Sequence, residues 1–217
     1  MYQETRAQKK PAGGAKTAAA EVQAAAPDVS YTVSMSKPAT HLLEVEMRVK
    51  WPQVPQVPDK TELKMPVWTP GSYLVREFAR HVQDFSARDA SGADLAWRKI
   101  SKNTWQVDSK GKNEFVAKYR VYANELTVRT NELNDEHAFW NNTALLMFVK
   151  DHLNIATTVK VNPYGNWRVA TGLPAVEGSP NTFRAENYDV LYDSPFEVSD
   201  FKEFKFEVLG KPHRYVV

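Results

Sequence analysis

The sequence has no cysteine among its 217 residues. Disulfide bonds, thiolate zinc sites, iron–sulfur clusters and cysteine nucleophiles are therefore excluded by chemistry. A metal site in this chain would have to be built from histidine and carboxylate ligands.

Long apolar runs are also missing. The longest spans residues 144–149, which is the length of a strand and far short of the roughly 18 residues that a membrane-spanning helix needs. No membrane span is expected. The amino terminus has Arg6, Lys9 and Lys10 without the continuous apolar segment of a secretory signal, so such a signal either never existed or has been removed.

The charge of the chain is nearly balanced, with 28 Lys+Arg against 26 Asp+Glu and a formal net charge of +2. Proteins that bind nucleic acid or anionic membranes through electrostatics have a pronounced positive excess or a basic patch. Neither kind of partner is expected.

The catalytic motifs of common hydrolases are absent. A His-Glu-x-x-His zinc motif does not occur, and neither do Gly-x-Ser-x-Gly or Gly-x-Gly-x-x-Gly. In Asp135-Glu136-His137, adjacent side chains of an extended chain point to opposite faces, which disfavours a shared metal. We therefore expect no cofactor and no catalytic residue in this chain, and predict that alone it binds no zinc and hydrolyses no aminoacyl substrate.

Residues 1–28 are rich in Ala, Gly, Lys and Gln and almost free of bulky apolar side chains. Such a segment buries too little surface to offset its ordering entropy, so it is predicted to be a flexible tail. The alternative is a helix over residues 16–26, although an isolated helix of that length is marginal in water.

From Val29 onward, short β-prone runs alternate with turn signals. Apolar residues alternate with polar ones over 29–35 and again over 43–51, which predicts an antiparallel hairpin. Three prolines in 51–58 predict a loop. The spacing indicates an all-β fold, an antiparallel sandwich with few short helices, formed as one domain over 29–217. Further strands are predicted at 82–88, 95–100, 104–107, 114–122, 144–149, 156–161, 167–170, 182–185 and 202–209.

Two segments have more polar residues than a plain sandwich requires, and polar loops are where binding function tends to lie. Residues 67–78 contain a Pro-Gly turn followed by Arg76 and Glu77. The alternative to a binding loop there is a turn into a short helix with a surface ion pair. Residues 128–142 group acids, amides, a histidine and two aromatics in a predicted long loop. The alternative there is a hydrated connector with two aromatic anchors.

These segments also resemble a known family. Residues 65–81, Met-Pro-Val-Trp-Thr-Pro-Gly-Ser-Tyr-Leu-Val-Arg-Glu-Phe-Ala-Arg-His, closely resemble the signature run in the amino-terminal domain of glycyl aminopeptidases, and 121–131, 167–173 and 188–197 resemble further family segments in family order. The resemblance extends from about residue 30 to the end. It implies a bacterial exopeptidase made of an amino-terminal β domain, a thermolysin-like zinc domain with the His-Glu-x-x-His helix, and a PDZ domain. Only the first is present in these 217 residues.

The resemblance also implies a saddle-like β domain that covers one side of the active-site cleft and contributes a polar residue to bind the free amine of the substrate. By the order of features, the substrate-binding loop would contain Asn131, Glu132 and His137. The implied partners are the catalytic domain of the same polypeptide and peptide amino termini. Zinc is expected in that catalytic domain, and a Gly/Ala preference is implied. The expected location is periplasmic or secreted, with the cytoplasm as the alternative.

Two other functions remain open. One is a free-standing β-sandwich that binds carbohydrate or protein, although the tryptophans at 51, 97, 105 and 167 fall at alternating apolar positions or beside turns, which favours packing over an exposed platform. The other is an interaction protein without catalysis. We also expect residues 188–196, with the loop 131–142, to expose an apolar patch for the missing domain; alternatively, Tyr188, Leu191 and Phe196 fill the end of the sandwich.

Overall fold

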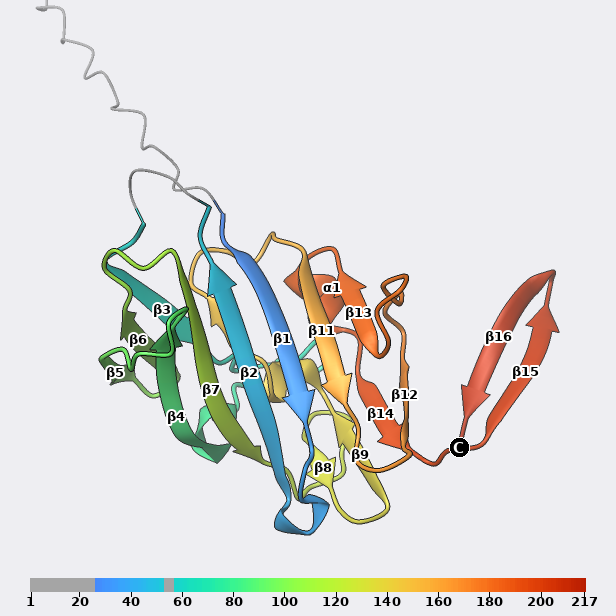
Figure 1. Ribbon diagram of the computed structural model, residues 1–217. Helices are drawn as coiled ribbons and strands as arrows, with labels where there is room; N and C mark the ends of the chain where they lie inside the picture. Colours follow the sequence, from blue (N-terminus) through green and yellow to red (C-terminus); the bar gives the residue numbers. More distant parts are fainter. Residues whose placement is uncertain (1–25, 53–56) are drawn as a thin grey trace, which may run out of the picture.

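The computed structural model describes residues 26–52 and 57–217. It is mostly β, with several antiparallel sheets and one short α-helix among these residues (Figure 1). The fold class predicted from the sequence is therefore confirmed. The predicted tail lies almost wholly outside the described residues, and only its last few residues are seen, with Asp28 already in a strand.

The largest sheet has six strands in the order β13-β11-β1-β2-β7-β4. The predicted hairpin is present, with Val29 opposite Val49 and Val33 opposite Val45. β1 pairs with β11 in parallel, an arrangement that the sequence pattern did not reveal. The strands are β1 (Asp28–Ser34), β2 (Leu42–Lys50), β4 (Val82–Asp89), β7 (Glu114–Tyr122), β11 (Thr157–Asn162) and β13 (Thr182–Ala185).

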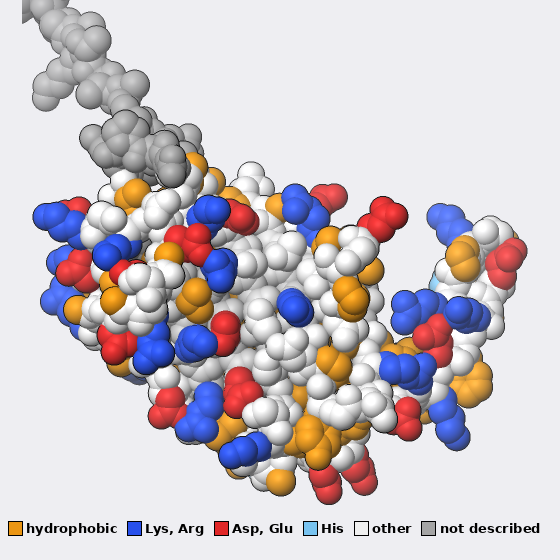
Figure 2. Space-filling model, viewed as in Figure 1, with side chains coloured by type: hydrophobic (Ala, Val, Ile, Leu, Met, Phe, Trp, Pro, Cys, Tyr) orange, Lys and Arg blue, Asp and Glu red, His pale blue; other side chains and the backbone are white. Residues whose placement is uncertain are grey.

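Alternation gives this sheet one apolar and one polar face. Val45 and Met47 of β2 are fully buried, while Glu46 pairs on the outer face with Lys118 of β7. Figure 2 shows the outer face, where acidic and basic side chains are interspersed. The inner face supplies most of the core, where Phe85 stacks with Trp105 at 5.8 Å between ring centroids.

Two four-stranded sheets complete the body. One has the order β10-β3-β6-β5 and the other β12-β14-β9-β8. In Figure 1 the first lies at the β4 end of the large sheet and the second at the β13 end, where α1 (Tyr188–Tyr192) also lies. Their strands are β3 (Lys60–Lys64), β5 (Trp97–Ser101), β6 (Thr104–Asp108), β8 (Glu132–Leu133), β9 (His137–Trp140), β10 (Phe148–Val149), β12 (Arg168–Thr171) and β14 (Phe196–Ser199).

The strand predicted at 144–149 is mostly wrong. A 3-10 helix occupies Asn142–Ala144, and only Phe148–Val149 form a strand. Residues 145–147 are a buried connector whose carbonyls are bound by tyrosine hydroxyls rather than by a neighbouring strand. Its apolar composition reflects burial, which a short run cannot distinguish from strand formation.

At 128–142 a long loop was predicted, but the segment contains two strands, β8 and β9. They form a tight hairpin that is closed by Asn134, whose side chain accepts hydrogen bonds from the backbone N–H groups of Glu136 and His137, both at 2.9 Å. The polar residues from Glu132 to His137 therefore form the turn and the outer face of a sheet. The asparagines at 131, 141 and 142 are buried.

A separate two-stranded hairpin ends the chain. β15 (Glu203–Val208) and β16 (Lys211–Val216) pair with each other and stand clear of the body in Figure 1. In the described part of the chain, no helix is both long and apolar enough to cross a membrane.

Candidate functional site

The segment 65–78 forms an irregular turn on the surface. Thr69 and Ser72 form an isolated bridge around Pro70-Gly71, where Gly71 has a φ of 77°. Glycine adopts this left-handed conformation without the penalty that a Cβ would bring. The backbone N–H of Arg76 returns to the carbonyl of Val67 at 2.6 Å, which closes the loop. The predicted turn is thus confirmed.

This turn presents large apolar side chains to solvent. Tyr73 is 79% exposed, and Trp68 contacts it with ring centroids 5.7 Å apart. Leu74 and Val75 are also exposed. Val75 lines a surface hollow together with Glu125, Thr127 and Arg129. Leu126 and Val128, which alternate with these residues along the chain, are exposed as well. We call the exposed set Trp68, Tyr73, Leu74, Val75, Leu126 and Val128 the apolar rim.

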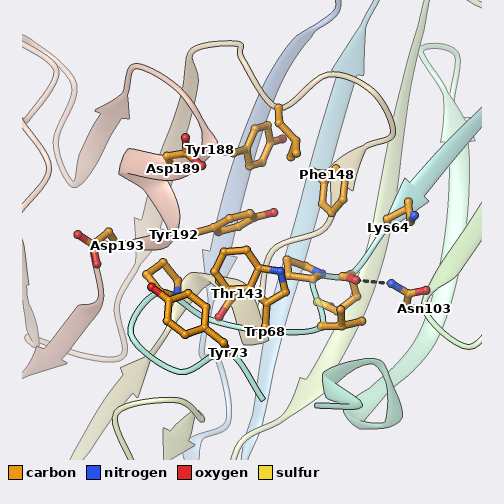
Figure 3. Close-up of a pocket in the computed structure, with 15 residues that line it drawn as sticks. Lys64, Trp68, Tyr73, Asn103, Thr143, Phe148, Tyr188, Asp189, Tyr192 and Asp193 are labelled. Atoms are coloured by element: carbon orange, nitrogen blue, oxygen red, sulfur yellow. Dashed lines mark hydrogen bonds between the residues drawn. The ribbon is translucent and has the colours of Figure 1, made fainter. Parts of the chain in front are cut away.

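A cavity of about 460 Å³ lies between this turn and α1. Figure 3 shows Trp68 and Tyr73 on one side and Tyr192 on the other, with Asp189 on α1 and Asp193 just after it. Most of its lining is apolar. Its geometry suits an apolar side chain or a group with a positive charge at the end near α1.

The helix itself was not predicted. Asn187 caps it, accepting a hydrogen bond from the backbone N–H of Val190 at 2.9 Å. Asparagine is a usual residue at the N-cap of a helix, so the sequence did contain a start signal. The helix was missed because it is only five residues long.

The apolar patch expected at 188–196 is not found as predicted. Tyr188, Leu191 and Phe196 are fully buried, and Phe196 stacks on Trp140 at 4.9 Å. They fill the end of the core, which was the alternative. On the body of the fold, exposed apolar side chains are found instead on the apolar rim, among other positions.

Asn131 is placed inside the fold. It is 5% exposed, its side-chain N–H donates to the carbonyl of Ala144 at 3.0 Å, and its oxygen accepts from the backbone N–H of Asn141 at 3.1 Å. Both ends of the amide are used to hold the connector after β9.

Glu132 and His137 lie on one face of the third sheet. Glu132 is directly opposite Phe139, and His137 precedes Phe139 by two residues, so all three point to the outer side. Glu132 accepts a hydrogen bond from the side chain of Asn134 at 3.1 Å, and His137 lies 3.4 Å from Glu197. The two side chains share a surface but are not bonded to each other.

Groups of three or more potential metal ligands are not found in the described residues. Asp135 and Glu136, next to His137, are exposed. The donor set therefore does not fit a zinc site in this part of the chain.

Comparison with known proteins decides the assignment. The family described as Peptidase M61 N-terminal domain matches residues 30–200. The chain belongs to this family. The match covers most of the chain, including the turn at 65–78, α1 and the β8–β9 hairpin, and it stops before β15.

Solved structures are also similar to this M61 N-terminal domain. An aminopeptidase N family protein from Idiomarina loihiensis is 33% identical, with a TM-score of 0.78 over 87% of this chain and 32% of that protein. The chain thus spans about a third of this relative. An M1 zinc metallopeptidase mutant from Deinococcus radiodurans, bound to a Tyr-Ser-Ala substrate, is 10% identical, with a TM-score of 0.49 over 87% of this chain and 46% of that one; the assignment does not depend on it. No curated protein matches the chain.

Proposed function

We propose that the chain acts as the accessory domain of a zinc-dependent aminopeptidase, in which it forms one wall of the cleft that receives peptide amino termini. The observation that supports this most is the match of residues 30–200 to the M61 N-terminal domain. The matched part is 32% of the Idiomarina relative, so about two thirds of that protein lies outside the match. We refer to the polypeptide with both parts as the full-length peptidase.

The apolar rim is proposed to face the catalytic domain. Exposed aromatic and aliphatic side chains gathered on one surface usually mark an interaction site. Trp68 and Tyr73 project from a turn that is closed by backbone hydrogen bonds, so little backbone order would have to be gained on contact.

Glu132 is proposed to bind the substrate's ammonium group, with His137 beside it. A carboxylate pairs well with an ammonium group in a partly desolvated cleft. Glu132 is half-buried on a strand and is oriented by Asn134. Asn131 is proposed to act indirectly, by fixing the connector next to β8.

Zinc is proposed for the catalytic domain, where it would polarise the scissile carbonyl and activate water. A preference for amino-terminal Gly or Ala is proposed as well. We also propose a periplasmic or secreted location, with the cytoplasm as the alternative; fractionation of cells that produce the full-length peptidase tests it.

The test is a kinetic comparison of two variants in the full-length peptidase. Glu132→Gln should raise KM for Gly- and Ala-p-nitroanilide about tenfold, equivalent to about 1.4 kcal/mol, with kcat and zinc content nearly unchanged. Glu136→Gln is the matched control, because it removes an exposed charge from the neighbouring turn. An unchanged KM in Glu132→Gln, or the same change in the control, would refute the role of Glu132.

A second candidate is a free-standing module that binds carbohydrate. The exposed pair Trp68 and Tyr73 favours it, since sugars stack on aromatic faces. The two rings are tilted by 41° and do not form one flat platform. Retardation of the chain in gels that contain polysaccharide, abolished by Trp68→Ala, would support this alternative.

A further inference from the structure

The β15–β16 hairpin lies outside the matched family domain. That match ends at residue 200, and β15 begins at Glu203. In the described part of the chain, each of the two strands pairs only with the other, so both outer edges are free. Figure 2 shows the hairpin separated from the body by solvent.

Its two faces differ sharply in character. Phe204 is opposite Tyr215 and Phe206 is opposite His213, so these rings share one face, where Phe206 and His213 stack at 5.2 Å. Phe204, Phe206 and Tyr215 are each more than half exposed. The other face holds charged residues, with Glu203 near both Lys205 and Arg214.

The turn defines the hairpin locally. Leu209 and Gly210 have φ values of 50° and 75°, the left-handed pair that two-residue hairpin turns require. The base is closed by reciprocal hydrogen bonds between the backbones of Lys202 and Val217, at 2.8 and 3.0 Å. The strand register is therefore fixed even though the aromatic face is largely exposed.

Phe201 anchors the base of the hairpin to the body. Phe201 is buried, and the guanidinium carbon of Arg168 lies 4.3 Å from its ring centroid. Beyond Phe201 the described chain makes no further strand pairing with the body. An isolated two-stranded hairpin is marginally stable in water, and one with an exposed aromatic face needs a partner surface.

We propose that this hairpin belongs structurally to the catalytic domain of the full-length peptidase, whose apolar sheet face covers Phe204, Phe206 and Tyr215. The domain boundary then falls at about residue 201 rather than after 217. Two observations point to the catalytic domain as the partner. The family match ends before the hairpin, and about two thirds of the Idiomarina relative lies outside the part that this chain matches. This inference rests on the proposed function only in requiring a catalytic domain.

The test uses two double variants of the hairpin. Phe204→Ser with Phe206→Ser removes the aromatic face, and Lys205→Ser with Glu207→Ser alters the charged face as the matched control. In the 217-residue chain, both should leave the melting temperature unchanged, and the wild type and both variants should all be monomers. In the full-length peptidase, the aromatic variant should lower by several degrees the melting transition that releases zinc, while the control should not.

Two results would overturn the inference. One is equal melting of the two full-length variants. The other is a concentration-dependent dimer of the 217-residue chain that the aromatic variant dissociates, because a second copy would then be the occupant. Failure here is distinguishable from failure of the cleft role, since Glu132→Gln changes KM and these variants change zinc-linked melting.

Discussion

The hydroxyl of Tyr119 donates a hydrogen bond to the carbonyl of Leu145 at 3.0 Å. The same oxygen accepts one from the backbone N–H of Met147 at 3.1 Å. Tyr31 donates to the carbonyl of Met147 at 2.5 Å, and Tyr192 to that of Leu146 at 3.3 Å. Tyrosines thus replace the strand partner that this buried connector lacks, since buried backbone groups must find partners.

The first prediction concerns this replacement. Tyr119→Phe keeps the ring but leaves the Leu145 carbonyl and the Met147 N–H without the hydroxyl, so it should lower the free energy of unfolding by about 1–3 kcal/mol. Urea titration followed by fluorescence measures it. Tyr164→Phe, at a half-exposed position, serves as the control. Equal stability of the two variants would contradict the role of Tyr119.

The second prediction concerns Asn142, which is fully buried. Its side-chain N–H groups donate to the carbonyls of Leu191 at 2.8 Å and Ser194 at 2.6 Å, and its oxygen accepts from the Trp140 indole at 3.0 Å. Asn142→Asp places a carboxylate oxygen against two carbonyls, which should cost about 3 kcal/mol or more.

The measurement is again urea unfolding, with exposed Asn162→Asp as the control. Since α1 lines the cavity, Asn142→Asp should also increase amide hydrogen exchange in α1. Exchange as slow as in the wild type would show that Asn142 does not hold the helix.

The third prediction is a loss of stability in alkali. Burial is the largest effect raising the pKa of Tyr31, Tyr119, Tyr188 and Tyr192 above the ordinary value of about 10. The folded state therefore retains protons that the unfolded state releases, so this stabilisation is complete below about pH 10 and decreases above it. After a rapid jump to high pH, part of the tyrosinate absorbance should appear only as circular dichroism reports unfolding. Complete ionisation before any loss of structure would contradict it.

The fourth prediction separates conformation from packing at the signature turn. Gly71→Ala adds a methyl group that meets nothing within 4 Å, but at a φ of 77°. The variant should lose about 1 kcal/mol from backbone strain alone. Gly172→Ala also meets nothing within 4 Å and has no such φ, so it should be nearly neutral. A thermal melt of both variants checks this, and equal effects would argue against strain at residue 71.

The sequence predicts strands well where alternation is regular. Val29 to Trp51 is such a case, because every second side chain enters the core. It misses β3, whose five residues include only Thr61 and Leu63 as buried positions. It wrongly predicts a strand over all of 144–149. The backbone carbonyls of this connector are bound by tyrosine hydroxyls from positions up to 116 residues away, which a local pattern cannot reveal.

The candidate site is predictable in part for similar reasons. The family resemblance implied Glu132 and His137 by the order of features, and the structure places them on one sheet face. In the sequence, Asn131 could not be distinguished from these two residues as a binding candidate. It is buried because its side chain bonds to Ala144 and Asn141, which reach it only after the chain has turned back through β9. The apolar rim escaped prediction because the segment of Leu126 and Val128 meets Val75 only in three dimensions, through neighbours such as Thr127.

The most direct test of the account is hydroxyl-radical footprinting of Trp68 and Tyr73 in the 217-residue chain and in the full-length peptidase. Both side chains are exposed here, and half-exposed Tyr164 provides the internal reference. If the apolar rim faces the catalytic domain, oxidation of Trp68 and Tyr73 should fall strongly in the full-length protein while that of Tyr164 stays the same. Equal oxidation of Trp68 and Tyr73 in the two proteins would contradict the proposed arrangement.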